Sequence, residues 1–458
     1  MKKYFAMNII IAGGGKVGQT LAHQLSAEGH NLTMIDSNNH VLEHSVEQYD
    51  AMAVSGNCAS KEVLLNASVS EADLLIAVTA MDEVNLLCCM TAHGLNPNLH
   101  TIARIRTPEY ADQIMTMRDV FPLSMTVNPE KQAAKEIERL LKFPGFLRRE
   151  SFAKGRAEIV ELRIDASSKL CNLPLSEMGN VIKCRVLVCA VLRAGNAVAP
   201  SGNFVLQEGD RIFVTAPTSN LEVLLKSLGI VPKKAKKILI CGGGRVSYYL
   251  TSLLADDNIS VYLMEKDRQQ CVRLAKELPN ATIIYGDCSS HTLLEDQGIE
   301  NMDSVITLTG TDETNMIISL YAGSRGVNQI ITKLSRAENS ALADSMALGS
   351  TVTPRELCCN NIVQYVRAMQ NQTGAAISVH TIADGQVEAV EFLVDETTKH
   401  CSKPLKDIKL KPNVLIASIT HGANTQVPNG LSEFMPGDTI VVVTSGRGVL
   451  HNVNDIFA

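Results

Sequence analysis

Two glycine-rich turns are the residues of this sequence best suited to hold a ligand. The first follows the apolar run Asn8 to Ala12 and reads Gly13, Gly14, Gly15, Lys16, Val17 and Gly18. Gly13 permits a tight turn, Gly15 lets a pyrophosphate approach the N–H groups that open a helix, and Gly18 allows the helix to pack closely on the strand. This pattern predicts nucleotide binding by Gly13, Gly14, Gly15, Lys16 and Val17. The alternative is a glycine turn that serves packing alone.

An acid completes the first pattern. Asp36 ends the next apolar run, 21 residues after Gly15. Its carboxylate would accept hydrogen bonds from the ribose hydroxyls of an adenosine and would repel a 2′-phosphate, so NAD is favoured over NADP.

The second turn departs from the first at two positions. It contains Gly242, Gly243, Gly244, Arg245 and Val246, with Glu265 at the acid position. Ser247 replaces the third glycine and is expected to loosen the packing of helix on strand, and Glu265 is a longer ribose ligand than an aspartate. We predict a second nucleotide site on these residues, with a scaffold that binds nothing as the alternative.

Further candidates follow the later strands, where open α/β sheets bind ligands. Asn57 and Cys58 come after the third strand and are candidates for contacts to the adenine, although an ordinary turn explains them equally well. Thr79 follows the fourth strand and is a candidate for a further cofactor contact.

Arg104 lies between apolar residues of a strand, so its charge requires a partner. A bound phosphate or the neighbouring acids Asp82 and Glu83 would supply one. Lys333 repeats a cation at the matching place in the second half of the chain. Asp82 and Glu83 follow the fourth strand and are candidates for lining the crevice, and the alternative for Asp82 is a cap of the helix that follows it.

The elements that position these residues occur twice. The run from Ile9 to Val17 returns as Ile238 to Val246, and the same offset relates Arg104 to Lys333. Later in the chain, Gly209-Asp210 matches Gly437-Asp438. Each half begins with strands that alternate with helices, which is typical of a doubly wound parallel sheet. In the first half we expect strands over Asn8 to Ala12, Asn31 to Ile35, Ala51 to Val54, Asp73 to Val78, His100 to Arg106 and Met125 to Val127, with helices over Gly15 to Glu28 and Pro129 to Phe143.

Each half ends in a smaller unit of short β-branched runs separated by Pro, Gly and Asn turns, which indicates an α+β domain. We therefore predict four domains: residues 1–150 and 233–374 as Rossmann-like nucleotide-binding domains, and residues 151–232 and 375–458 as small α+β domains. Residues 231–237 contain four lysines and are expected to form an exposed linker, with lipid contact as the alternative.

The amino-acid composition argues against some classes of function. The chain has 458 residues, 45% hydrophobic and 20% charged, with a formal net charge of -6 and no Trp. Such a balance argues against nucleic-acid binding, which needs a basic surface. No apolar run approaches the roughly 18 residues of a membrane span. The twelve cysteines lack CxxC spacing and read as small buried side chains, and no metal site or catalytic residue is predicted.

Together these residues resemble the TrkA family of Trk-type potassium uptake systems, which is built from regulator-of-K⁺-conductance (RCK) domains. The resemblance rests on the Gly13 to Gly18 loop, Asp36, Gly56-Asn57-Cys58, the stretch Ala77 to Leu86 and Ala103 to Arg106. It covers the whole chain, in the order nucleotide lobe, C-terminal lobe, nucleotide lobe, C-terminal lobe.

The resemblance implies a regulatory subunit that is not an enzyme. It would bind NAD(H), or ATP and ADP, on Gly13 to Val17, Asp36, Asn57, Cys58, Thr79 and Arg104, and in the second copy on Gly242 to Val246 and Glu265. It also implies a tetramer beneath a membrane-embedded potassium translocating subunit similar to TrkH or TrkG, in the cytoplasm at the inner face of the plasma membrane. The competing interpretations are a nucleotide-sensing scaffold of another transporter and an NAD-dependent dehydrogenase.

Overall fold

The computed structural model describes residues 6–116, 122–230, 235–336, 339, 346, 348–369, 376–383, 385–445, 450 and 452–458. The chain divides into two units, Met1–Ala134 with Thr353–Tyr365 and Lys135–Val352 with Val366–Ala458. The first unit contains one parallel sheet, and the second contains a parallel sheet and two antiparallel ones.

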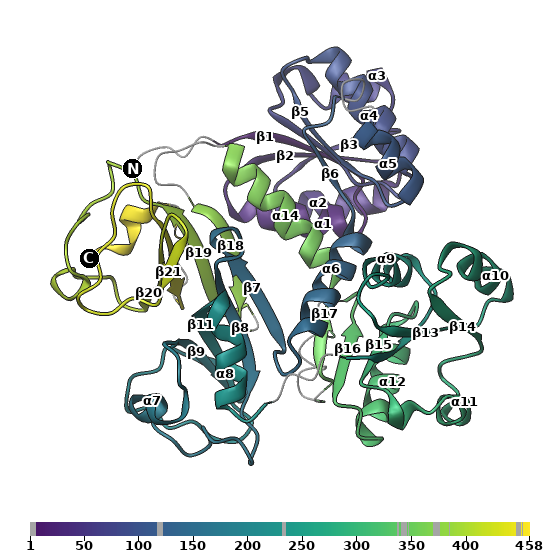
Figure 1. Cartoon of the computed structure of the whole chain (residues 1–458). Coiled ribbons are helices and arrows are strands. Elements are labelled where there is room, and N and C mark those ends of the chain that lie inside the picture. The colour runs from purple at the N-terminus through teal and green to yellow at the C-terminus, as the bar shows by residue number, and fades with distance from the viewer. Residues whose placement is uncertain are drawn as a thin grey trace. The chain divides into compact units, whose positions relative to one another are not determined.

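The first lobe is a six-stranded parallel sheet in the order β3-β2-β1-β4-β5-β6. Its central strand is a run of β-branched residues, Ile9 to Ile11, that is buried on both faces, as a parallel sheet covered by helices requires. Helices α1 and α2 cover one face and α3 to α5 the other (Figure 1). The strands are β1 Asn8–Ala12, β2 Asn31–Asp36, β3 Met52–Ser55, β4 Leu74–Ala77, β5 His100–Arg104 and β6 Met125–Val127, and the helices are α1 Lys16–Ala27, α2 Asn39–Tyr49, α3 Lys61–Asn66, α4 Asp82–Leu95, α5 Pro108–Thr116 and α6 Pro129–Lys142.

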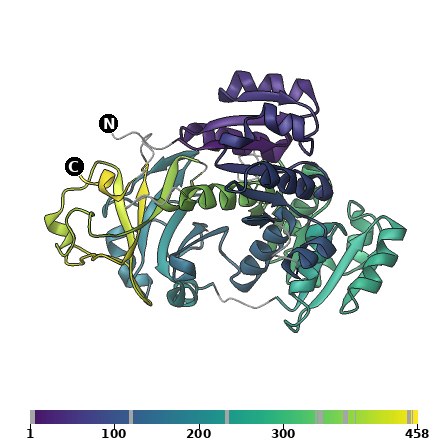
Figure 2. The same ribbon diagram turned by 90° about the horizontal axis from the view of Figure 1, so that it is seen from above.

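The second lobe repeats this order as β14-β13-β12-β15-β16-β17. In both lobes the strand order reverses beside the first strand, so the glycine turn opens at the switch point where such sheets bind ligands. Figure 2 shows the same layering of helices on a sheet from above. The strands are β12 Lys237–Cys241, β13 Ser260–Glu265, β14 Ala281–Tyr285, β15 Ser304–Thr307, β16 Gln329–Lys333 and β17 Ser350–Val352, and the helices are α9 Arg245–Leu253, α10 Arg268–Glu277, α11 His291–Asp296, α12 Asp312–Ser324 and α14 Pro354–Met369.

Two small antiparallel sheets follow the lobes, in equivalent orders β7-β8-β11-β9-β10 and β18-β19-β22-β20-β21. They share an apolar core that includes Phe152, Phe213, Ile382 and Val441. The elements are β7 Arg148–Phe152, β8 Ala157–Arg163, α7 Met178–Val181, β9 Leu187–Arg193, β10 Asn196–Val198, β11 Arg211–Pro217 and α8 Leu221–Ser227, then β18 Ala376–Ile382, β19 Val387–Leu393, β20 Val414–His421, β21 Asn424–Gln426 and β22 Thr439–Thr444.

The helix that follows each parallel sheet packs on the other lobe. The first half of α14 belongs to the first unit, where the Cys359 thiol lies 3.7 Å from the carbonyl of Val17. The second half of α6 belongs to the second unit, where the Gln329 side chain donates to the Leu140 carbonyl at 2.8 Å. The last helix of each lobe therefore completes the packing of its counterpart.

The predicted fold class is confirmed: two Rossmann-like parallel sheets, each followed by a small α+β domain. The four domain bounds stay a prediction. Of the expected linker, residues 231–234 lie outside the described part of the chain, and Lys237 begins β12 instead of belonging to a loop. No helix among the described residues combines the length and the hydrophobicity that a bilayer crossing requires.

Candidate functional site

The first glycine turn leaves open space at the start of α1. Gly13 has a φ of +107°, and a β-carbon there would lie 2.9 Å from the Thr79 nitrogen, so only glycine fits this turn. A β-carbon on Gly15 would meet nothing within 4 Å. Gly15 is therefore the point at which a ligand can approach the helix N-terminus, whose N–H groups and dipole favour an anion. Lys16 is exposed beside this opening and Val17 is buried beneath it.

Asp36 connects the end of β2 to the glycine turn. One carboxylate oxygen accepts from the Gly14 N–H at 2.7 Å and the other accepts from the Asn38 N–H at 2.8 Å. These two bonds hold the carboxylate next to the opening at Gly15, and the side chain stays half-buried. The geometry matches what a ribose-binding acid needs.

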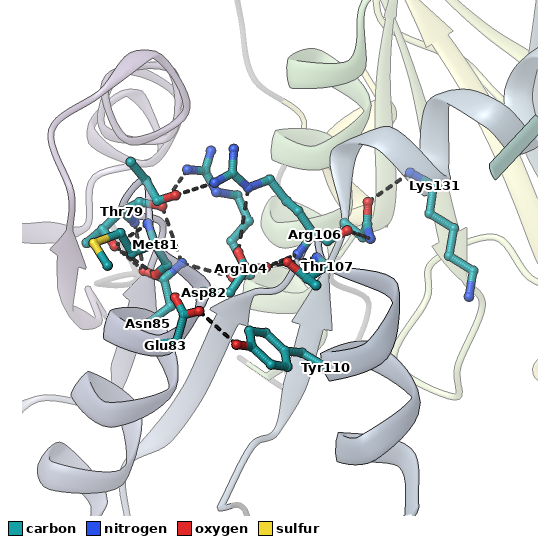
Figure 3. Close-up of polar contacts among 12 residues, drawn as sticks. Thr79, Met81, Asp82, Glu83, Asn85, Arg104, Arg106, Thr107, Tyr110 and Lys131 are labelled. Carbon is teal, nitrogen blue, oxygen red and sulfur yellow. Dashed lines mark hydrogen bonds and ion pairs between the residues drawn. The ribbon is translucent and has the colours of Figure 1, made fainter. Parts of the chain in front are cut away.

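A buried amide joins the ends of β4 and β5. The Asn85 side chain on α4 accepts from the Thr79 N–H at 2.8 Å and from the Thr79 hydroxyl at 2.7 Å, and it donates to the Arg104 carbonyl at 2.9 Å (Figure 3). Because Asn85 has no exposed surface, losing these bonds would leave several polar groups unsatisfied. This amide sets the position of both Thr79 and Arg104.

The Arg104 guanidinium is turned toward the end of β4. It donates to the Thr79 carbonyl (Figure 3). Burial lowers the pKa of Arg104, and the nearby charge of Arg106 lowers it further, whereas Glu130 opposes the shift. Its Nε is buried and has no hydrogen-bond partner among the described residues, so the cation is only partly compensated. A bound anion would complete its interactions.

The expected capping role of Asp82 is wrong. Met81 is the N-cap residue and Asp82 is the first residue of α4. The Asp82 carboxylate instead accepts from the Arg106 N–H at 2.9 Å and the Thr107 N–H at 2.8 Å, beyond the end of β5 (Figure 3). Burial tends to raise the pKa of Asp82, but these N–H donors hold it below its ordinary value. The donors lie 24 and 25 residues away in sequence, so local spacing could not reveal them.

Asn57 and Cys58 lie in the turn after β3. The Asn57 side chain accepts from the Ala59 N–H at 3.0 Å, as in an ordinary Asx turn. Cys58 is 5% exposed and belongs to the core of the lobe, where a hydrogen bond with the Cys88 thiol lowers its pKa. Both residues thus have a structural role, and their contact with an adenine stays a prediction.

The second lobe builds the same arrangement with different side chains. A Glu265 oxygen accepts from the Gly243 N–H at 2.6 Å. The Asn315 side chain accepts from the Thr309 N–H and donates to the Lys333 carbonyl, the second bond being 3.0 Å long. The Lys333 ammonium donates to the Thr309 carbonyl at 2.7 Å, which is the position of the Arg104 interaction. A β-carbon on Gly244 would again meet nothing within 4 Å. Arg245 is exposed and Val246 is buried beside it.

Two features distinguish the second turn. Ser247 is fully buried and its hydroxyl donates to the Gly242 carbonyl. The Gln270 side chain donates to the Gly243 carbonyl at 2.8 Å. Both hydrogen bonds connect the turn to other residues of the same lobe. The hydroxyl of Ser247 is thus accommodated by a hydrogen bond, and the packing of the helix on the strand is not simply loosened.

Asn85 and Asn315 are the residues that sequence reasoning missed as parts of the site. The two amides occupy matching places in the two halves of the sequence, and Asn85 lies on the buried side of α4 together with Asp82, Cys88, Cys89 and Ala92. A polar residue repeated on a buried helix face was the available signal.

The arrangement as a whole fits an adenine dinucleotide or a related nucleotide. Gly15 leaves room for phosphates, Asp36 presents acceptors for ribose hydroxyls, and Arg104 presents a partly compensated cation. Among the described residues, no group of three or more His, Cys, Asp or Glu side chains could hold a metal ion. The site is suited to binding and presents no nucleophile paired with a base among these residues.

Comparison with known proteins agrees with this geometry. The TrkA-N domain model matches residues 9–120 and 238–354, and the TrkA-C domain model matches residues 159–229 and 389–453. The chain is 28% identical over 457 residues to the Trk system potassium uptake protein TrkA of Vibrio alginolyticus, covering 98% of each chain. It is 29% identical over 443 residues to TrkA homolog 1 of Methanosarcina mazei, covering 95% of this chain and 97% of that protein.

Solved structures share the fold at lower identity. The GsuK RCK domain superposes with a TM-score of 0.61 at 16% identity, covering 97% of this chain and 94% of that one. A GsuK channel bound to NAD gives a TM-score of 0.60 at 17% identity, covering 97% of this chain and 78% of that one.

Proposed function

Because the chain belongs to the TrkA family, we propose that it is the regulatory subunit of a Trk-type potassium uptake system. In this role it binds NAD(H), or ATP and ADP, and controls potassium transport by a membrane-embedded translocating subunit similar to TrkH or TrkG. It works as a tetramer in the cytoplasm at the inner face of the plasma membrane, and it is a sensor of the nucleotide instead of an enzyme that consumes it.

One observation carries the proposal. The Asp36 carboxylate is held 2.7 Å from the Gly14 N–H, beside a turn whose next residue, Gly15, faces open space. Acceptors for a ribose and donors for a phosphate are thereby placed together at the switch point of the sheet. The fold shared with a channel that binds NAD supports the same ligand class. The negative charge of Asp36 favours NAD(H) over its 2′-phosphorylated form.

Regulation requires that the nucleotide bind two states of the assembly with different affinity, because a ligand that binds both equally shifts no equilibrium. The residues that would sense the ligand lie at the ends of β1, β2, β4 and β5. Asn85 links two of these ends through Thr79 and Arg104, so a phosphate held by Arg104 would act on the position of α4.

Calorimetric titration of NAD, NADH, ATP and ADP against the full chain tests the site. Asp36→Ala removes the acceptors for the ribose, so we expect its affinity at the first site to fall by roughly 10- to 100-fold, as the loss of hydrogen bonds to a charged group predicts. Glu71→Ala is the matched control, because Glu71 is exposed at the opposite, N-terminal end of the same sheet. Thermal unfolding of each variant establishes that it remains folded.

Two results would contradict the proposal. If Asp36→Ala binds every nucleotide as tightly as the unaltered chain, the site is assigned wrongly. If the chain oxidises NADH in the presence of carbonyl acceptors with repeated turnover, it is a dehydrogenase instead of a regulator.

A further inference from the structure

A lysine-rich stretch lies on the surface of the second antiparallel domain. Residues 399–411 contain Lys399, Lys403, Lys406, Lys409 and Lys411 and one acid, Asp407, so the formal charge is 5 − 1 = +4. All five lysines are exposed. The lysine ion pairs found within the described residues involve Lys142 and Lys226 instead. The positive charge of this stretch is therefore not neutralised by ion pairs within the described part of the chain.

A second loop runs beside this stretch and exposes apolar side chains. The N–H groups of Ser402, Leu405 and Lys406 donate to the carbonyls of Phe434, Ser432 and Gly430, each at 2.9 Å. Leu431 is 68% exposed and Met435 is 48% exposed within this adjoining loop. We call the five lysines together with Leu431 and Met435 the basic–apolar surface.

The first antiparallel domain has the same backbone without this surface. There the N–H groups of Asn172, Leu175 and Ser176 donate to the carbonyls of Leu206, Phe204 and Gly202. These bonds match those of the second domain one for one and fix which residues are equivalent.

By that equivalence, polar residues stand where the second domain has exposed apolar ones. Leu431 corresponds to Asn203, Met435 to Gln207 and Lys406 to Ser176. The stretch 169–181 contains one lysine and one glutamate, for a formal charge of 1 − 1 = 0. Because the fold forms in the first domain with Ser176, Asn203 and Gln207 at these places, it does not require Lys406, Leu431 or Met435.

We infer that the basic–apolar surface docks on an anionic phospholipid bilayer. Lysines that flank protruding apolar side chains are the pattern of proteins that lie on a membrane, because the ammonium groups attract lipid phosphates while the apolar side chains enter the boundary of the acyl chains. In the loop that contains Leu431 and Met435, Glu433 is the one exposed carboxylate, and its charge opposes this attraction. The lysines are spread along a loop. Lipid headgroups can move laterally to meet ammonium groups spaced in this way, whereas the carboxylates of an acidic protein partner are fixed in position.

Flotation of the full chain with vesicles tests the inference without a transporter or a nucleotide. We expect binding to vesicles of phosphatidylcholine mixed with phosphatidylglycerol, release at high salt, and no binding to phosphatidylcholine alone. The triple variant K406S/L431N/M435Q installs the residues of the first domain. We expect this variant to bind the anionic vesicles at least about tenfold more weakly than the unaltered chain, because the loss of one lysine alone lowers the membrane partition coefficient by roughly fivefold.

The matched control is K183S/V223N, which removes one exposed lysine and one exposed apolar side chain from the first antiparallel domain and should bind vesicles normally. The inference is overturned if the unaltered chain does not bind anionic vesicles. It is also overturned if the triple variant binds them as tightly as the unaltered chain. It is also overturned if the triple variant changes only self-association in sedimentation velocity, because the surface would then be an interface between copies. Nucleotide titration of the triple variant should be unchanged, so a failure here is distinct from a failure of the proposed function.

Discussion

At the scale of single residues, the charge of the Glu136 carboxyl depends strongly on its surroundings. It lies on the second half of α6, where the Arg139 guanidinium donates to it at 2.9 Å. Burial raises the pKa of Glu136 to about 7, against the opposing influence of Arg139. Two further acids nearby, Glu150 and Glu158, add to the increase. The folded chain therefore takes up a proton on this group at a higher pH than the unfolded chain does.

This pKa predicts how stability depends on pH. A carboxyl whose pKa is higher in the folded state than in the unfolded state binds more protons when folded, so its contribution to stability is present below its ordinary pKa of 4.5 and is lost as the pH rises to about 7. Glu136→Gln removes this loss. We expect the variant to be more stable than the unaltered chain at pH 8 by about 1 to 3 kcal/mol, with little difference at pH 4.5.

Urea unfolding at several pH values measures this difference. Glu138→Gln on the same helix is the control, because Glu138 pairs with Lys142 at the surface. An equal gain at pH 4.5 and pH 8 would show that the effect does not come from the ionisation of Glu136.

At the scale of elements, the contact between the glycine turn and its helix distinguishes the two lobes. A β-carbon on Gly18 would collide with the Gly13 carbonyl oxygen, whereas Ser247 occupies the equivalent place and bonds to the Gly242 carbonyl. The first helix thus approaches its strand in a way that only glycine permits, and the second turn must differ locally.

Gly18→Ala is expected to destabilise the chain by about 1 to 3 kcal/mol, because the added methyl group forces α1 away from the turn. Gly94→Ala is the control. Gly94 lies in α4, and a β-carbon there would meet nothing within 4 Å, so this change should stabilise the helix by about 0.5 to 1 kcal/mol. Equal effects of the two substitutions on the melting temperature would refute the close contact at Gly18.

At the scale of the whole molecule, one chain carries two candidate sites and two helices, α6 and α14, that contribute residues to both units. A regulator built in this way should couple its sites, and coupling free energies of about 1 to 3 kcal/mol correspond to roughly 5- to 150-fold changes in affinity.

We expect Asp36→Ala to change the affinity of the second site, and Glu265→Ala to change that of the first by the same factor, because coupling between binding sites is reciprocal. Titration of the two single variants and the double variant with NAD measures both factors. If each single variant keeps the remaining site at its original affinity, the two sites are independent. If the double variant binds NAD as tightly as the unaltered chain, the ligand is held elsewhere.

Much of the fold was predictable because its signals are local. The strand, glycine turn and helix at Asn8–Ala12 and α1 were predicted to within a residue or two, as was α6. The duplication was visible because both halves keep one register from Ile9 and Ile238 onward. The prediction of the TrkA family, made from these motifs, is confirmed. The binding roles of the site residues themselves stay a prediction.

The place predicted to hold a nucleotide follows from the amino-acid sequence alone, because a tight turn, an open helix start and a spaced acid must lie within one short stretch of chain. The contacts that support this place are visible only in the folded chain. Asp82 binds backbone groups beyond β5, Asn85 joins two strand ends, and Leu431 lies in a loop beside Lys406. These contacts join segments far apart in the chain, and the free energy of packing, not the spacing of residues, brings them together.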